Sequence, residues 1–400
     1  MKFYQTIIDA MKKNGMLMAL IGVVILFQVL LIATGKGVLL TPANISNIIV
    51  QNSYVVILAT GMLLCILTGG NIDLSVGAVV CVIGAVAGTL IVNMGVNIYV
   101  SIALCLFLGI AIGAWQGFWI AYVGIPPFIV TLAGFLYWRG VALLILDGLT
   151  ISPFPSNYLN LFTSFIPASK DVLITPEEAV FIKTVTITIG AIICLLFLAY
   201  LIKDRITKIR KGYDTDSLVA TISRFVLISG GVMYVIWLLA NHKGIPIVLV
   251  ILGVIVLGYS YFTNKMVPGR HFYALGGNAK ATRMSGIDTK KIMFFAYTNM
   301  GFLAAVAGLV VAGRFNSANP AAGTLYELDA IGACFIGGAS AYGGTGTVGG
   351  SVVGAMFMGV LNNGMSYLGL DANLQKTVKG LVVLAAVVFD VLSKRNSKSK

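Results

Sequence analysis

Apolar runs long enough to cross a lipid bilayer recur along most of this chain. Met16–Ala33, for example, contains no charged residue, and a helix needs roughly 17–25 largely apolar residues to cross the ~30 Å hydrocarbon core. With 58% hydrophobic and 10% charged residues, a soluble fold could not cover its apolar side chains. Backbone groups in lipid must pair internally, and strict alternation of apolar and polar residues is absent. The sequence therefore predicts an all-α polytopic membrane protein with about 10–11 transmembrane helices.

The positive charges predict how these helices are oriented. The formal charge is +13, and most of the 27 Lys and Arg residues lie in segments that can share one side: Lys2–Lys13, Lys203–Arg224, Lys265–Lys291 and Lys394–Lys400. By the positive-inside rule that side is cytoplasmic. We expect one transmembrane domain over residues 1–400, cytoplasmic loops at 203–224 and 263–291, and both termini inside. No basic face interleaved with exposed aromatics points to nucleic acid.

A polar break, TGGNIDLSVG, interrupts the apolar runs at Thr68–Gly77. Its Asp73 is the only acidic residue between Asp9 and Asp147, and an ionisable residue between spans is by default a functional-site hypothesis. Topology predicts that the break lies at or near the inner face. There, Asp73 and Ser75 are placed to cap the following helix, so they are expected to shape a turn near a gate.

A second glycine-rich break, YGGTGTVGG, follows at Tyr342–Gly350. The stretch Leu67–Val80 is similar to Phe335–Val353, since each has a span ending in Gly-Gly, a polar break, and Val-Gly opening the next helix. This predicts a weak internal repeat of about 15–146 and 292–392. Paired broken helices in two halves of a transporter commonly mark the translocation path.

The predicted loop at 263–291 has helix signals of its own. Asn278 can cap a short helix, and Gly286 can end it before Lys290 and Lys291. A short helix held against the membrane suits docking to a soluble partner. The alternative is an ordinary positive-inside loop.

These breaks and this loop, together with GIPPFIVTLAG (Gly124–Gly134) and YELDAIGACFIGG (Tyr326–Gly338), resemble the permease subunit of bacterial ABC importers for monosaccharides. Ribose, xylose and galactose permeases are similar, and the extra basic segment resembles the longer xylose or multiple-sugar branch. The resemblance implies a type II ABC importer-like fold in the bacterial cytoplasmic membrane. It also implies a homodimer, cytoplasmic ATPase subunits and an extracytoplasmic sugar-binding protein as partners.

The same resemblance implies roles for particular residues. The segment that would receive the ATPase contains Gly276, Gly277, Asn278, Ala281, Ser285 and Gly286. A neutral sugar needs hydrogen-bonding groups and aromatic faces along its path. The candidates for the path or gate are Asn71, Asp73, Ser75, Trp115, Gln116, Glu327 and Asn362. Each has a structural alternative: Gln116 and Asn362 could simply bond neighbouring helices, and Arg139 could snorkel outward or pair with Glu327.

The sequence contains no sign of catalysis. No GxxxxGK[ST] motif occurs, so ATP hydrolysis is expected in a separate subunit, and no metal-ligand cluster or cofactor motif is visible. The five cysteines lie in apolar runs and are expected to be small core residues. Two alternatives stay open: a nucleoside-type ABC permease, and an ion-coupled secondary transporter that uses Asp73. A non-transporting scaffold or receptor is a third class. The residues also leave open which sugar or nucleoside is carried, and whether the permease pairs with itself or with a different permease.

Overall fold

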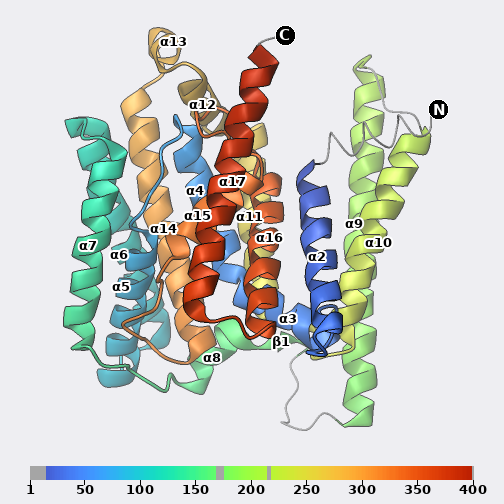
Figure 1. Ribbon diagram of the computed structural model, residues 1–400. Coiled ribbons are helices and arrows are strands. Elements are labelled where there is room, and N and C mark those ends of the chain that lie inside the picture. Colours follow the sequence, from blue (N-terminus) through green and yellow to red (C-terminus); the bar gives the residue numbers. More distant parts are fainter. Residues whose placement is uncertain (1–14, 168–174, 214–217, 399–400) are drawn as a thin grey trace.

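The computed structural model describes residues 15–167, 175–213 and 218–398, and these form a bundle of helices (Figure 1). Within this part of the chain, eight helices are long and apolar enough to cross a membrane, or nine if a bent pair counts as one span. The expectation of an all-α polytopic membrane protein is therefore confirmed. The basic segment Lys2–Lys13 lies outside the described residues.

The first half of the chain runs from α2, right of centre in Figure 1, to α5, α6 and α7 at the left. Its elements are α2 (Gly15–Ala33), α3 (Pro42–Gln51), α4 (Ser53–Leu67), α5 (Val76–Gly88), the π-helical turn η1 (Thr89–Asn93), α6 (Ile98–Phe118), the π-helical turn η2 (Trp119–Val123), α7 (Pro127–Leu146) and α8 (Ser156–Thr163). The strand β1 (Phe165–Ile166) pairs antiparallel with β2 (Ile245–Pro246).

The second half adds a peripheral hairpin and the remaining core helices. Its elements are α9 (Pro176–Arg210), α10 (Leu218–Ala240), α11 (Ile247–Lys265), α12 (Val267–Gly277), α13 (Ala279–Met284), α14 (Thr289–Phe315), α15 (Tyr326–Ile336), α16 (Val348–Tyr367) and α17 (Ala372–Lys398). At 1.5 Å per residue, α15 is only ~16 Å long and cannot cross a bilayer alone. Helices α16 and α17 are long enough to cross a bilayer but are not among the eight helices that are both long and apolar enough.

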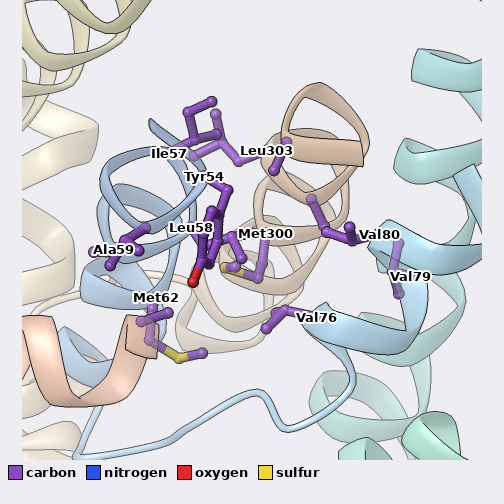
Figure 2. Packing of buried hydrophobic residues seen from close by; sticks show 14 of the residues in the cluster. Tyr54, Ile57, Leu58, Ala59, Met62, Val76, Val79, Val80, Met300 and Leu303 are labelled. Carbon is purple, nitrogen blue, oxygen red and sulfur yellow. The ribbon is translucent and has the colours of Figure 1, made fainter. Parts of the chain in front are cut away.

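Helix α4 is the centre of the core. Every residue from Ser53 to Leu67 is buried, and its apolar side chains pack on α14, whose other side packs on α5 (Figure 2). Gly61 makes this close packing possible, because a Cβ atom there would lie 2.7 Å from the sulfur of Met300. Four of the cysteines are buried and Cys194 is partly buried, as expected for core residues.

Several helix limits differ from the sequence prediction. Helix α3, which the sequence analysis did not describe, is capped by Thr41: Pro42 occupies the first helical position, and the Thr41 hydroxyl accepts the Asn44 N–H at 3.3 Å. Helices α8 and α12 were not predicted. Residues 203–224 are mostly the ends of α9 and α10 rather than a loop, since α9 continues to Arg210 and α10 begins at Leu218.

The first break does not stay at one face of the bundle. The Asp73 N–H lies 3.4 Å from the sulfur of Met62, which is about 7.5 Å back along α4 from its last residue, Leu67. The chain after Leu67 thus turns and runs back along α4, and α5 starts inside the bundle (Figure 1). The expectation that the whole break lies near a face is wrong for its second half.

Candidate functional site

The helix predicted between Asn278 and Gly286 is present as α13. The Asn278 side chain accepts the Ala281 N–H at 3.0 Å, and Gly286 follows the helix with a left-handed φ of +81°. A polar N-cap and a glycine after the last turn are the local signals that start and stop a short helix. The predicted short helix is therefore confirmed, and docking at this segment stays a prediction.

Helix α13 protrudes at one end of the molecule, which we call the α13 end (Figure 1). Its surface is almost entirely exposed: Met284 is 81% exposed, Lys280 and Arg283 are exposed, and only Thr282 is buried. An exposed methionine flanked by two cations is a surface that a soluble partner could cover.

Helix α12 ends in a backbone contact with the last residue of α4 and with the second glycine-rich break. A Cβ atom added at Gly276 would lie 1.9 Å from the Leu67 carbonyl oxygen and 2.4 Å from the Gly344 nitrogen. The Gly344 N–H in turn donates to the Leu67 carbonyl at 3.1 Å. Gly276, the end of α4 and the second break therefore meet with no side chain between them.

The two breaks also contact each other directly. A Cβ atom at Gly70 would lie 1.9 Å from the Ala341 carbonyl oxygen, and one at Gly343 would lie 2.5 Å from the Gly69 Cα. The Tyr273 hydroxyl of α12 donates to the Gly346 carbonyl at 3.0 Å. We call the residues Leu67–Gly70, Gly276 and Ala341–Gly346 the glycine junction. It makes one structural unit of three segments that the sequence analysis described separately.

Three of the predicted path residues form one buried chain of hydrogen bonds. The Asp73 carboxylate accepts the Ser75 N–H at 2.8 Å and the Ser75 hydroxyl at 2.6 Å, and the Gln116 amide donates to that hydroxyl at 2.8 Å. Each of the three is at most 3% exposed. Ser75 is the N-cap residue of α5 but makes no side-chain cap. Asp73 thus orders the turn before α5 rather than bonding its first helical N–H groups.

Glu327 lies where two short helices begin. A Cβ atom at Gly77, near the start of α5, would lie 2.2 Å from the Gly323 carbonyl oxygen and 2.5 Å from the Glu327 carboxylate. Farther along α5, the Cys81 thiol donates to the Pro320 carbonyl at 3.5 Å. The chain leading into α15 therefore runs antiparallel to α5, and both helices start inside the bundle. Glu327 is 7% exposed, and its Oε2 has no hydrogen-bond partner among the described residues.

The remaining predicted path residues lie elsewhere. Asn71 is half-buried next to the glycine junction, where its amide donates to the Thr68 hydroxyl at 3.1 Å. Trp115 is 43% exposed and stacks on Tyr137, with ring centroids 6.0 Å apart. Asn362 is buried in α16, and its Oδ1 has no partner among the described residues. The structure brings together Asp73, Ser75 and Gln116 and leaves Trp115 and Asn362 apart from them.

Arg139 neither extends outward nor pairs with Glu327, the two alternatives that the sequence left open. It donates to the carbonyls of Pro320 and Ala322, at 3.1 and 2.7 Å. It therefore supports the chain before α15 instead of forming an ion pair with Glu327. A guanidinium with several donors suits two neighbouring carbonyls.

A buried charged group was missed by the sequence analysis. Asp329 in α15 is 0% exposed; it accepts the Tyr54 hydroxyl at 2.6 Å and pairs with Lys379 of α17 at 3.0 Å. The only signal in the sequence was a second acidic residue, Asp329, two positions after Glu327. Its partners Tyr54 and Lys379 are far away in the chain, so the sequence did not show that it is paired. Within the described part of the chain, no three His, Cys, Asp or Glu gather as a metal site would.

Comparison with known proteins gives consistent matches over nearly the whole chain. The family model described as "Branched-chain amino acid transport system / permease component" matches residues 44–170 and 172–387. The xylose transport system permease protein XylH of Escherichia coli K12 is 35% identical over 96% of this chain and 94% of its own length. XylH of Haemophilus influenzae is 34% identical, over 94% of this chain and 96% of its own.

The ribose import permease protein RbsC of E. coli K12 is 33% identical, over 92% of each chain. No solved structure matches.

Proposed function

Because this chain belongs to the family described as branched-chain amino acid transport system permease components, we propose that it is the transmembrane permease subunit of an ATP-binding-cassette importer. Its substrate is a monosaccharide. The observation that carries the proposal is that permeases named for xylose and ribose match more than nine-tenths of the chain from end to end. The protein is a multi-pass membrane protein, and we place it in the bacterial cytoplasmic membrane with both termini inside.

The ATPase docks at the α13 end, on the segment containing Gly276, Gly277, Asn278, Ala281, Ser285 and Gly286. Support comes from the exposed Met284 and the cations around it. The glycine junction carries movement of α12 to both breaks, because backbone in direct contact cannot shift without moving its neighbour. ATP hydrolysis takes place in the partner subunit, and a sugar-binding protein delivers the substrate to the opposite face. Two copies of this chain form the pore.

The buried cluster at Asp73 has a positioning role in this scheme. Asp73 holds the turn that starts α5, next to the start of α15 and Glu327. Short helices that begin within the bundle are the elements that line or gate paths in many transporters. The first break connects the glycine junction to the start of α5, and the chain before the second break connects it to the end of α15. Movement at the junction therefore reaches both short helices through the chain.

The energy source distinguishes this function from an ion-coupled secondary transporter using Asp73. Proteoliposomes containing this chain alone, given a proton or sodium gradient, are expected not to accumulate sugar. Liposomes with the ATPase, the binding protein and ATP are expected to do so. Gradient-driven uptake by the chain alone would overturn the proposal.

A nucleoside-type permease remains the second candidate within the same transporter class, since the broad organisation of that branch is similar. The discriminating measurement is competition: radiolabelled xylose or ribose uptake by the complete system is challenged with pentoses, hexoses, uridine and adenosine. We expect only sugars to compete. If the complete system takes up labelled uridine or adenosine but no labelled sugar, the chain belongs to the other branch.

A further inference from the structure

A polar cavity of about 380 Å³ lies at the end of the bundle opposite α13, where α3 meets the last turns of α14 and α16. Its polar lining comes mainly from Asn44, Asn47, Gln51, Arg314, Asn363 and Ser366. The volume lies within the roughly 300–1,000 Å³ of small-molecule sites. The predicted path residue Asn362 adjoins the cavity in the chain but is not among its lining residues.

An amide pair builds one wall of this cavity. The Asn44 side chain donates to Asn363 and the Asn363 side chain donates back, each at 3.0 Å. Asn44 also donates to the Leu39 carbonyl at 2.8 Å. Asn44 is 0% and Asn363 4% exposed, so the pair holds α3 against α16. A carboxamide has two N–H donors, and the second one of Asn363 is left for another acceptor.

The rest of the lining carries polar groups with hydrogen-bonding capacity left over. Among the described residues, the side chains of Asn47 and Gln51 make no hydrogen bond. Arg314 donates to the Gln51 carbonyl only at 3.5 Å, and the Ser366 hydroxyl donates to a backbone carbonyl, which leaves its oxygen able to accept. Tyr367, 41% exposed, adds an aromatic ring to the lining.

This combination fits a neutral polyhydroxylated ligand. Amides and hydroxyls can each satisfy both the donor and the acceptor of a sugar hydroxyl, and an aromatic ring can cover its C–H face. Arg314 is the one charged residue of the lining. We propose that the cavity is a low-affinity receiving site for a monosaccharide at the face where the sugar enters. The inference rests on the proposed function, which places this end outside.

The first test compares uptake by two variants. Combining Asn47→Leu with Gln51→Leu replaces two amide side chains by apolar side chains of similar volume. The buried pair of Asn44 and Asn363 is left unchanged. The control is Asn157→Leu, which changes an exposed asparagine of α8. We expect uptake at limiting sugar to fall about tenfold in the double variant, as for the loss of two modest hydrogen bonds. Association with the ATPase and the uptake rate at saturating sugar should stay near wild type.

The second test detects occupancy directly. Asn47→Cys and Asn157→Cys are made in a Cys194→Ser background, and their rates of labelling by a membrane-impermeant maleimide are measured with and without millimolar D-xylose, D-ribose or D-gluconate. The two sugars are expected to slow labelling at position 47 several-fold and to leave position 157 unchanged. Equal rates at position 47 would overturn the receiving site, and protection by gluconate alone would show an anion site instead.

The two proposals fail in different ways. If wild-type protein in the complete system takes up sugar with ATP but position 47 is unprotected and the double variant matches its control, only the receiving site is wrong. If the complete system takes up no sugar, the proposed function is wrong.

Discussion

At the scale of single residues, two buried carboxylates have opposite surroundings. Asp73 accepts two hydrogen bonds from Ser75 and has no cation beside it among the described residues. Asp329 has a cation, Lys379, and a hydroxyl donor, Tyr54. The first arrangement organises a turn within one segment, and the second joins α15 to α4 and α17. Only the second therefore couples separate helices through charge.

Asp73→Asn is expected to reduce sugar transport only mildly. The amide oxygen can still accept both bonds from Ser75. Asp73→Leu removes the acceptor and leaves the buried Ser75 N–H unpaired, at a cost of about 1–3 kcal/mol, while the Ser75 hydroxyl keeps its bond to Gln116. Thermal unfolding in detergent and ATP-driven uptake measure the two effects. Complete loss of uptake in well-folded Asp73→Asn would instead make Asp73 a substrate or coupling acid.

Lys379→Met is expected to destabilise the protein by about 3–5 kcal/mol, because it leaves the Asp329 carboxylate buried without its cation. Lys376→Met, three residues earlier on an exposed part of α17, is the control and should change stability little. Chemical or thermal denaturation of both variants in the same detergent gives the comparison. Equal stability of the two variants would contradict a buried ion pair.

At the scale of elements, α12 and α13 differ in how they meet the rest of the molecule. Helix α13 touches little and is open to a partner, whereas α12 ends at Gly276 against the backbone of Leu67 and Gly344. One short segment thus has an exposed half, which we propose docks the ATPase, and a tightly packed half, which we propose transmits its movement. Changes in the two halves should have separable effects.

Gly276→Ala tests the packed half. Its Cβ atom would collide with the Leu67 carbonyl oxygen, whereas a Cβ atom at the neighbouring Gly277 meets nothing within 4 Å. Overpacking of this kind costs roughly 1–3 kcal/mol, so we expect transport to fall about tenfold while the ATPase still co-purifies. Gly277→Ala should transport normally. Normal transport by Gly276→Ala would rule out the glycine junction as the coupling element.

Gly286→Trp tests the exposed half. Gly286 has φ +81° and open space around it, so a bulky residue there strains the turn and blocks the docking surface. Gly212, between α9 and α10, has φ +68° and equally open space, which makes Gly212→Trp a control matched for strain. We expect only Gly286→Trp to lose ATPase co-purification, with both variants inserted in the membrane. Loss in both variants, or in neither, would refute docking at this site.

At the scale of the whole molecule, one end of the bundle is basic and the other carries the polar cavity. Lys280, Arg283 and Lys290 are exposed around α13, and the opposite end has the cavity lined by α3, α14 and α16. The positive-inside rule assigns the α13 end to the cytoplasm. The same orientation puts the ATPase and the incoming sugar on opposite faces, as import requires.

Single-cysteine labelling in intact cells measures this orientation. Asn157→Cys in α8 is expected to react with an impermeant maleimide added outside. Met284→Cys in α13 should react only after the cells are permeabilised. The reverse pattern would invert the topology and remove the basis for docking at α13.

Much of the fold could be predicted from the sequence because its causes are local. Hydropathy identified the apolar run Met16–Ala33, which the structure shows as α2 (Gly15–Ala33), since the bilayer requires a continuous apolar run. Asn278 and Gly286 identified α13, because capping depends on residues within one turn. The predicted family of transport permeases was confirmed by matches along most of the chain.

The tertiary structure alone decided how these pieces meet. Three features join residues from different elements: the path of 68–75 back along α4, the contact of Gly276 with Leu67 and Gly344, and the pairing of Asp329 with Lys379. The pair of Asn44 and Asn363 joins residues 319 apart in the chain. Local signals carry no information about which helices become neighbours, because that choice depends on how side chains of the whole bundle pack at once.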